Sequence, residues 1–274
     1  LTGGGNDHPE GGWLDRNYLA LALACSTGIL NEVPYSYCAH WGMPNEISSL
    51  RSALQNAFGT AGAPYYGMVQ DMEHRDVEVL MLYPIDLVAT DERFGSWMTQ
   101  YGYANVITQD KLLERGTVVD GVIEVAGRRF STLATLFEPF PSQKLLAMMT
   151  QLAEQGGRVV WSGPPPIVDR NGAPVLEAWS ALTGAEYAPN PGTGLILPGR
   201  QVNFSGALEG VPQMTILTDF TVDRVHPLTP RADATVVAMA GKYVAGTHRT
   251  LGKGTVTTLG FRPRDDQSGS LGYE

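Results

Sequence analysis

Residues 130–163, FSTLATLFEPFPSQKLLAMMTQLAEQGGRVVWSG, contain the pattern that decides the fold. Short apolar runs at 133–137 and 158–161 have the length of buried strands. The residues between them predict a helix that Ser142 caps and Gly156 ends, since serine favours N-caps and glycine often follows a helix. Its inward face should hold Leu145, Leu146, Met149, Leu152 and Ala153. Strand, helix and strand in this order predict a parallel βαβ unit.

The same alternation extends back to residue 76. Apolar runs at 77–83 and 104–108 predict two more strands, and a helix at 90–101 is expected between them, capped by Thr90 or Asp91. Together these elements predict an α/β fold with a doubly wound, mostly parallel sheet. After residue 190 the composition becomes β-rich. Strands are expected at 214–222, 234–240, 243–250 and 255–261, with a tight turn at 252–254.

The first 75 residues have a different character. A helix of small residues is expected at 18–27, a strand at 28–37 and an amphipathic helix at 44–58. A charged run, residues 71–76, reads as a solvated linker. We therefore expect two parts, residues 1–75 and residues 76–274.

Composition excludes several classes of function. Lys and Arg total 19 against 28 Asp and Glu, a net charge of −9 that disfavours nucleic-acid binding. No apolar stretch is long enough to span a membrane. Dinucleotide, Walker A and zinc-protease motifs are absent, and no histidines have zinc-ligand spacing, so we expect neither cofactor nor metal. The chain starts at Leu1 without a signal-peptide pattern, which leads us to expect a piece of a longer protein of undecided compartment.

The turn at Ser162 and Gly163 follows a predicted central strand. Doubly wound folds bind ligands at this position, and class I amidotransferases place a nucleophilic cysteine there. Here the position holds Ser162, a proline run follows it, and residues 76–274 contain no cysteine. A cysteine-dependent amidotransferase is therefore excluded. We interpret Ser162 as structural and keep Ser162 and Gly163 as a candidate switch-point turn.

Residues 130–163, together with AGTHRTLGKGTVTTLG at 245–260, resemble the middle domain of family 42 β-galactosidases. The resemblance covers about residues 76–262. It implies a class I glutamine-amidotransferase-like (flavodoxin-like) fold without the amidotransferase triad. That domain is often called the trimerisation domain, so the resemblance also implies packing on a glycosidase barrel and a homo-oligomer.

On this resemblance, residues 1–75 would be the C-terminal end of a (β/α)8 barrel. Five residues would then lie near the carboxyl end of a strand, where barrel enzymes bind substrate, and an aromatic ring there stacks on a sugar. They are Glu32, Tyr35, Tyr37, His40 and Trp41. Ordinary packing is the alternative for the aromatic residues, and a rim or hydrogen-bonding role suits Glu32 better than a catalytic one. Since glycosidases need two carboxyl groups, we assign no catalytic residue.

Two functions follow as hypotheses. The first is the C-terminal portion of a carbohydrate-active glycoside hydrolase, with a non-catalytic amidotransferase-like domain for packing and oligomerisation. The isolated chain would then be silent or would depend on a partner polypeptide. The alternative is a stand-alone flavodoxin-like protein that binds a small ligand or serves as a scaffold.

Overall fold

The computed structural model describes residues 77–89, 104–188, 194–215 and 224–263. The chain divides into two units, Leu1–Asp76 and Val77–Glu274, and every described residue belongs to the second. The elements expected within residues 1–75 and the helix expected at 90–101 lie outside the described residues. The roles expected for the two parts therefore stay predictions.

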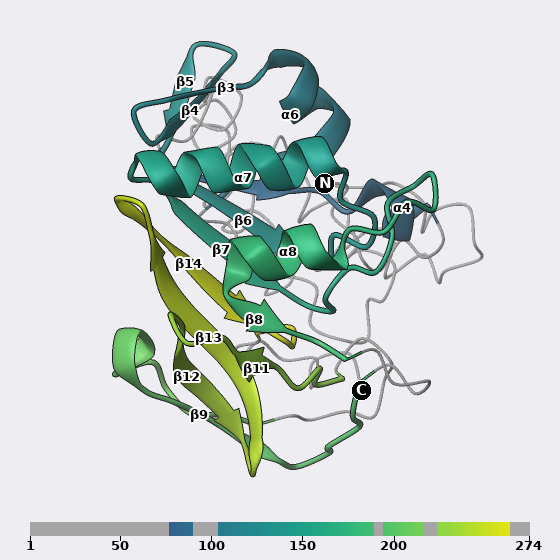
Figure 1. The fold of residues 1–274 in the computed structure, drawn as a ribbon, viewed down its shortest axis with the longest axis vertical. Coiled ribbons are helices and arrows are strands. Elements are labelled where there is room, and N and C mark those ends of the chain that lie inside the picture. The colour runs from purple at the N-terminus through teal and green to yellow at the C-terminus, as the bar shows by residue number, and fades with distance from the viewer. Residues whose placement is uncertain (1–76, 90–103, 189–193, 216–223, 264–274) are drawn as a thin grey trace, which may run out of the picture. The chain divides into compact units, whose positions relative to one another are not determined.

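One large sheet runs through the described residues (Figure 1), in the order β10-β9-β12-β13-β14-β7-β6-β1-β2. Its strands are β1(Val79–Leu82), β2(Asn105–Ile107), β6(Thr132–Leu136), β7(Arg158–Ser162), β9(Gln201–Phe204), β10(Met214–Thr215), β12(Thr235–Ala240), β13(Tyr243–Leu251) and β14(Gly254–Leu259). From β14 to β2 the neighbours are parallel, and from β10 to β14 they are antiparallel. The expected sheet is mostly parallel, whereas the described one is mixed.

The antiparallel pairing of β12, β13 and β14 in the large sheet has a local cause. Short turns join β12 to β13 and β13 to β14, and a short turn can only join antiparallel neighbours. Parallel neighbours need a crossover, which helix α7(Gln143–Gln155) supplies between β6 and β7. The α/β class and the β-rich later part are thus confirmed for the described residues. The flavodoxin-like arrangement and winding on both faces stay predictions.

The βαβ unit agrees with the sequence pattern. Ser142 Oγ accepts a hydrogen bond from the Leu145 amide at the start of α7, and Gly156 ends the helix with a φ of 120°. The buried residues of α7 are the five that the pattern predicts: Leu145, Leu146, Met149, Leu152 and Ala153. The expected helix is confirmed with its cap, its inward face and its end.

Helices α7 and α8(Leu176–Thr183) cover the same face of the sheet in Figure 1. Beneath them, Leu133 and Trp161 of the central strands join one large apolar cluster, and Trp161 meets Trp179 of α8 edge to face at 6.2 Å. Ala134 and Leu136 alternate with Leu133 and belong to a cluster on the opposite face. The central strands are therefore buried on both faces.

A three-stranded sheet precedes β6 and was not expected from the sequence. It consists of β3(Thr117–Val119), β4(Val122–Val125) and β5(Arg128–Phe130), joined by turns at 120–121 and 126–127. All four turn residues have positive φ, from 50° at Ala126 to 75° at Gly121. The Asp120-Gly121 pair between two valine-rich runs was a readable hairpin signal.

The remaining elements are short. They are α4(Ile85–Val88), α6(Gln109–Arg115), β8(Ala185–Glu186), β11(Thr229–Pro230) and the 3-10 helix η5(Gly206–Leu208). In the described part of the chain, no helix is long and apolar enough to cross a membrane.

Replacing Ala126 by glycine is expected to stabilise the protein by about 0.5–1 kcal/mol. Ala126 is exposed and has a φ of 50°, a conformation that costs a side-chain-bearing residue about 1–2 kcal/mol and glycine almost nothing. The greater freedom of glycine in the unfolded chain offsets part of this gain. Urea unfolding of Ala126→Gly measures the effect.

Gly127→Ala is the matched control on the same turn. Its φ is 74°, and a Cβ there would meet nothing within 4 Å, so only backbone strain changes. We expect this variant to be destabilised by about 1 kcal/mol. A destabilised Ala126→Gly would show that the turn does not keep its left-handed conformation.

Candidate functional site

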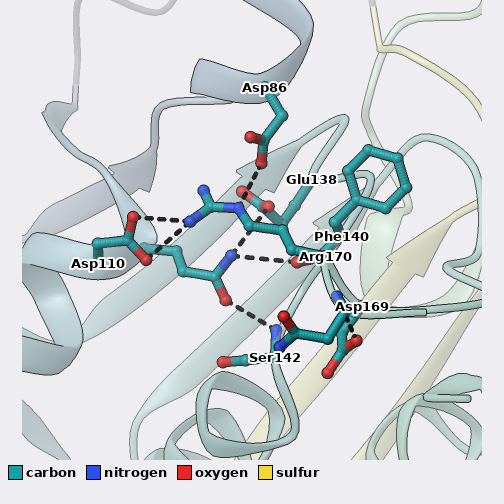
Figure 2. Close-up of polar contacts among 9 residues, drawn as sticks. Asp86, Asp110, Glu138, Phe140, Ser142, Asp169 and Arg170 are labelled. Atoms are coloured by element: carbon teal, nitrogen blue, oxygen red, sulfur yellow. Dashed lines mark hydrogen bonds and ion pairs between the residues drawn. The ribbon is translucent and has the colours of Figure 1, made fainter. Parts of the chain in front are cut away.

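Polar side chains gather where four neighbouring parallel strands end. Asp86 follows β1, Gln109 and Asp110 follow β2, Glu138 follows β6, and Arg170 lies in the loop after β7. The carboxyl ends of parallel strands share one edge of the sheet, and Figure 2 shows Asp86, Asp110, Glu138 and Arg170 converging there. Gln109 joins them through its hydrogen bond to Glu138. We call these five residues the strand-end cluster. Doubly wound sheets bind their ligands at this kind of edge.

Arg170 links its own loop to helices α4 and α6 through ion pairs. Its Nε lies 2.7 Å from Asp86 Oδ2, and its Nη1 donates to both carboxylate oxygens of Asp110, at 2.8 and 2.6 Å. Both contacts to Asp110 come from one nitrogen, so the pair lacks the two parallel N–H···O bonds of the strongest arginine–carboxylate geometry. Because the Asp110 side chain is 66% exposed, solvent screens that pair, and its contribution to stability is about 1 kcal/mol or less.

The loop that carries Arg170 is closed by Asp169. Asp169 Oδ1 accepts hydrogen bonds from the amides of Asn171 and Ala173, at 2.8 and 2.9 Å. The Asp169 amide donates to the Ala173 carbonyl, and Val168 bridges to Pro174. The loop therefore presents Arg170 at the tip of a small, internally bonded hairpin.

Gln109 organises the connection between β6 and α7. Its Nε2 donates to the Phe140 carbonyl at 3.1 Å and to Glu138 Oε1 at 3.5 Å, and its Oε1 accepts from the Ser142 amide at 2.7 Å. Gln109 and Glu138 are each only 2% exposed. One buried amide thus fixes the Glu138 carboxyl, the chain at Phe140 and the start of α7.

Glu138 is the unusual titratable group of the cluster. Burial and the nearby Asp86 carboxylate raise the pKa of Glu138 to about 7, although Arg170 acts in the opposite direction. Its backbone neighbour Phe137 has a positive φ of 58°, which is strained for an aromatic residue. The arrangement can therefore exchange a proton near neutral pH at a buried carboxyl beside an ion-paired guanidinium.

The candidate switch-point turn lies at the end of β7. Ser162 is 3% exposed, and its hydroxyl donates to the Thr135 carbonyl at 2.6 Å. The amide of Gly163 donates to the Leu259 and Phe261 carbonyls, and a Cβ at Gly163 would lie 3.2 Å from the Phe137 amide nitrogen. These contacts are compatible with a structural role for Ser162. A ligand role for this turn stays a prediction.

The other residues expected to bind substrate, Glu32, Tyr35, Tyr37, His40 and Trp41, lie outside the described residues. The strand-end cluster, in turn, was missed by the sequence reading. Part of its signal is present, because Asp86, Gln109 and Glu138 each come within three residues of the end of an apolar run. These residues could have been nominated one by one from their positions after expected strands, but not as a cluster.

Charge limits what the strand-end edge can bind. Asp86 and Asp110 pair with a single guanidinium, that of Arg170, and the Glu138 carboxyl lies near it, so an anionic ligand such as a phosphate is disfavoured. In the described ranges, no group of three His, Cys, Asp or Glu side chains could hold a metal ion.

The comparisons with known proteins bear on the fold. No protein-family model matches the chain, and no curated protein matches it significantly. Among solved structures, the GH42 β-galactosidase Gan42B has a TM-score of 0.51 at 16% identity, over 80% of this chain and 31% of Gan42B. A catalytic mutant of Gan42B from G. stearothermophilus gives the same values. A β-galactosidase from the Antarctic haloarchaeon Halorubrum lacusprofundi has a TM-score of 0.49 at 14% identity, over 76% of this chain and 32% of that protein.

The fold therefore matches GH42 β-galactosidases over part of the chain. The chain spans 31% of the length of the first of these structures. At this level of identity the match concerns the fold alone.

Proposed function

We propose that this chain is part of a carbohydrate-active glycoside hydrolase of the GH42 β-galactosidase kind. Val77–Glu274 would be a non-catalytic, amidotransferase-like domain that packs on a glycosidase barrel and mediates homo-oligomerisation. The observation that carries the proposal is the fold match to Gan42B, which extends over 80% of this chain but only 31% of that enzyme. A match of this kind is what an accessory part of a larger enzyme would give.

The carboxyl groups of the described residues support a non-catalytic role. Asp86 and Asp110 are both ion-paired with Arg170, and Glu138 is buried. Glycoside hydrolysis needs two carboxyl groups on either side of a bound sugar, one as acid and one as nucleophile or base. The strand-end cluster offers no such open pair. Under this proposal Glu32, Tyr35, Tyr37, His40 and Trp41 would contact the sugar from the end of the barrel.

The alternative, a stand-alone flavodoxin-like protein that binds a small ligand, is favoured by the position of the strand-end cluster. Its polar groups lie at the edge where such folds bind ligands. Their hydrogen bonds and ion pairs are, however, largely made to one another. Saturable binding of an uncharged small ligand such as riboflavin by the purified chain would support this alternative.

Two measurements test the proposal. The purified 274-residue chain should not hydrolyse an aryl β-galactoside above the buffer rate, and light scattering should give a multiple of its 29.5 kDa mass. Turnover would contradict the non-catalytic assignment, and a monomer would contradict oligomerisation.

The glycosidase assignment itself is tested by the coding sequence before Leu1, where we expect a barrel with two glutamates at strand ends. An unrelated preceding sequence would contradict it.

A further inference from the structure

Four polar side-chain atoms are buried between helix α8 and the large sheet without a hydrogen-bond partner in the described part of the chain. They are Trp161 Nε1, Trp179 Nε1, Thr247 Oγ1 and Thr258 Oγ1. The exposed fraction of each of these residues is 0%. Buried polar groups in native proteins almost always have a partner, which is either another protein group or an ordered water molecule. Four unpaired atoms in one layer of the fold therefore need an explanation.

The register of the sheet places these four groups side by side. Thr258 on β14 pairs with Trp161 on β7 and with Thr247 on β13. Residues that are paired in this way point to the same face of a sheet, on strands about 4.8 Å apart. The ring of Trp161 meets that of Trp179 on α8, and α8 also contacts β13 and β14. The three strand residues thus form a row on the face that α8 covers.

The kinds of polar group in this layer match the hydrogen-bonding capacity of water. An indole N–H can only donate, whereas a threonine hydroxyl both donates and accepts. A water molecule accepts from an indole and donates to a hydroxyl at the same time. With two hydrogen bonds of about 2.8 Å each, it bridges atoms that are up to about 5.6 Å apart. This reach is similar to the spacing of paired side chains on neighbouring strands.

The surroundings of the layer exclude other kinds of ligand. Trp161 and Trp179 belong to the large apolar cluster, together with Leu182 and Val256, and burying an ion among apolar side chains is very costly. A metal ion would also find no acceptor on an indole N–H. Since the four residues are completely buried, the ligand must be small enough to be enclosed in the core.

We propose that the layer between α8 and strands β7, β14 and β13 is a binding site for buried water. At least one water molecule accepts a hydrogen bond from Trp161 or Trp179 and bonds to the hydroxyl of Thr247 or Thr258. A buried water typically makes about three hydrogen bonds to polar groups that lack a protein partner, and this layer supplies four such groups. The site lies inside the Val77–Glu274 unit and does not depend on the proposed glycosidase function.

A high-resolution crystal structure of the full chain tests the site directly. A peak of electron density should lie about 2.7–3.2 Å from Trp161 Nε1 or Trp179 Nε1, and at a similar distance from one of the two threonine hydroxyls. A layer without such a peak would overturn the proposal, whether the hydroxyls stay unpaired or turn toward backbone carbonyls.

Thr258→Val tests the site in solution through the sign of its effect on stability. Valine keeps the shape of the side chain and removes the hydroxyl. If the hydroxyl binds water, the variant loses a hydrogen bond, and the ratio of folded to unfolded protein should fall about fivefold. If the hydroxyl has no partner, its removal relieves an unsatisfied polar group and the ratio should rise. Urea unfolding measures the ratio.

Thr255→Val is the matched control on the same strand. Thr255 is only partly buried, so this variant measures what exchanging threonine for valine does in β14 away from the layer. Thr258→Val should be less stable than this control. Equal or greater stability would show that the Thr258 hydroxyl binds nothing, and the proposal would fail.

Discussion

Replacing Glu138 by glutamine should raise the free energy of unfolding by about 3 kcal/mol at pH 8 and leave it nearly unchanged at pH 4. In the folded protein the pKa of Glu138 is raised from 4.5 to about 7, and the side chain is only 2% exposed, so solvent screening is small. Glutamine keeps the shape and the hydrogen-bonding capacity toward Gln109 without the buried charge. Urea unfolding of both proteins between pH 4 and pH 8 measures the difference.

The sign of this pH dependence follows from proton binding. The pKa of Glu138 is higher in the folded state than in the unfolded state, so between these two pKa values the folded state binds one proton more. Stability therefore falls as the pH rises from about 4.5 to about 7, and the loss persists above pH 7. One pKa unit corresponds to about 1.4 kcal/mol, which gives the magnitude stated above.

Glu154→Gln on α7 is the matched control. Glu154 is exposed, and its side chain makes no hydrogen bond or ion pair with the described residues. We expect a change within about 0.5 kcal/mol at either pH. If Glu138→Gln instead destabilises the protein at both pH values, the fold requires the carboxyl group itself, and its burial is not a net cost.

Local signals explain what the sequence could predict. The cap at Ser142, the inward face of α7 and the end of the helix at Gly156 all depend on residues within about 15 positions of one another. The two hairpins after residue 234 are equally local, since each is formed by neighbouring strands and a short turn. Such short-range patterns can be recognised in the sequence without knowledge of the strand order.

The strand-end cluster could not be predicted in the same way. Asp86 and Arg170 are 84 positions apart, and their contact depends on strand order. β1 lies between β2 and β6, so the loops after β1, β2 and β7 meet only once this topology is formed. The sequence can nominate polar residues at strand ends, but it does not say which ends are neighbours.

Two glycine motifs show the same limit of sequence-based prediction: each motif is predicted, but the contact between them is not. The sequence predicts Gly156-Gly157 as a helix end and the residues at 252–254 as a hairpin turn, and both predictions are confirmed. What it does not predict is that they touch. The Lys253 amide donates to the Glu154 carbonyl and the Thr255 amide to the Gly157 carbonyl, at 3.1 and 3.2 Å.

Gly254→Ala is therefore expected to destabilise the protein by about 4 kcal/mol or more, enough to abolish folding of a marginally stable domain. A Cβ at Gly254 would lie 2.0 Å from the Gly157 carbonyl oxygen and 2.5 Å from that of Ala153. Both obstacles are backbone atoms at the end of α7, so no side chain can turn aside to relieve the overlap. Yield of folded protein and urea unfolding measure the loss.

Lys253→Ala separates the effect of the overlap from that of changing the turn. Lys253 is exposed, and its contact with α7 is made by its amide, which alanine retains. A change within about 0.5 kcal/mol is expected. Should Gly254→Ala lose less than about 1 kcal/mol, the end of α7 would have to shift away from β14 at little cost. That shift would strain the Thr255 hydrogen bond to Gly157. The result would show that the fold does not require the close approach of α7 and the β13–β14 hairpin.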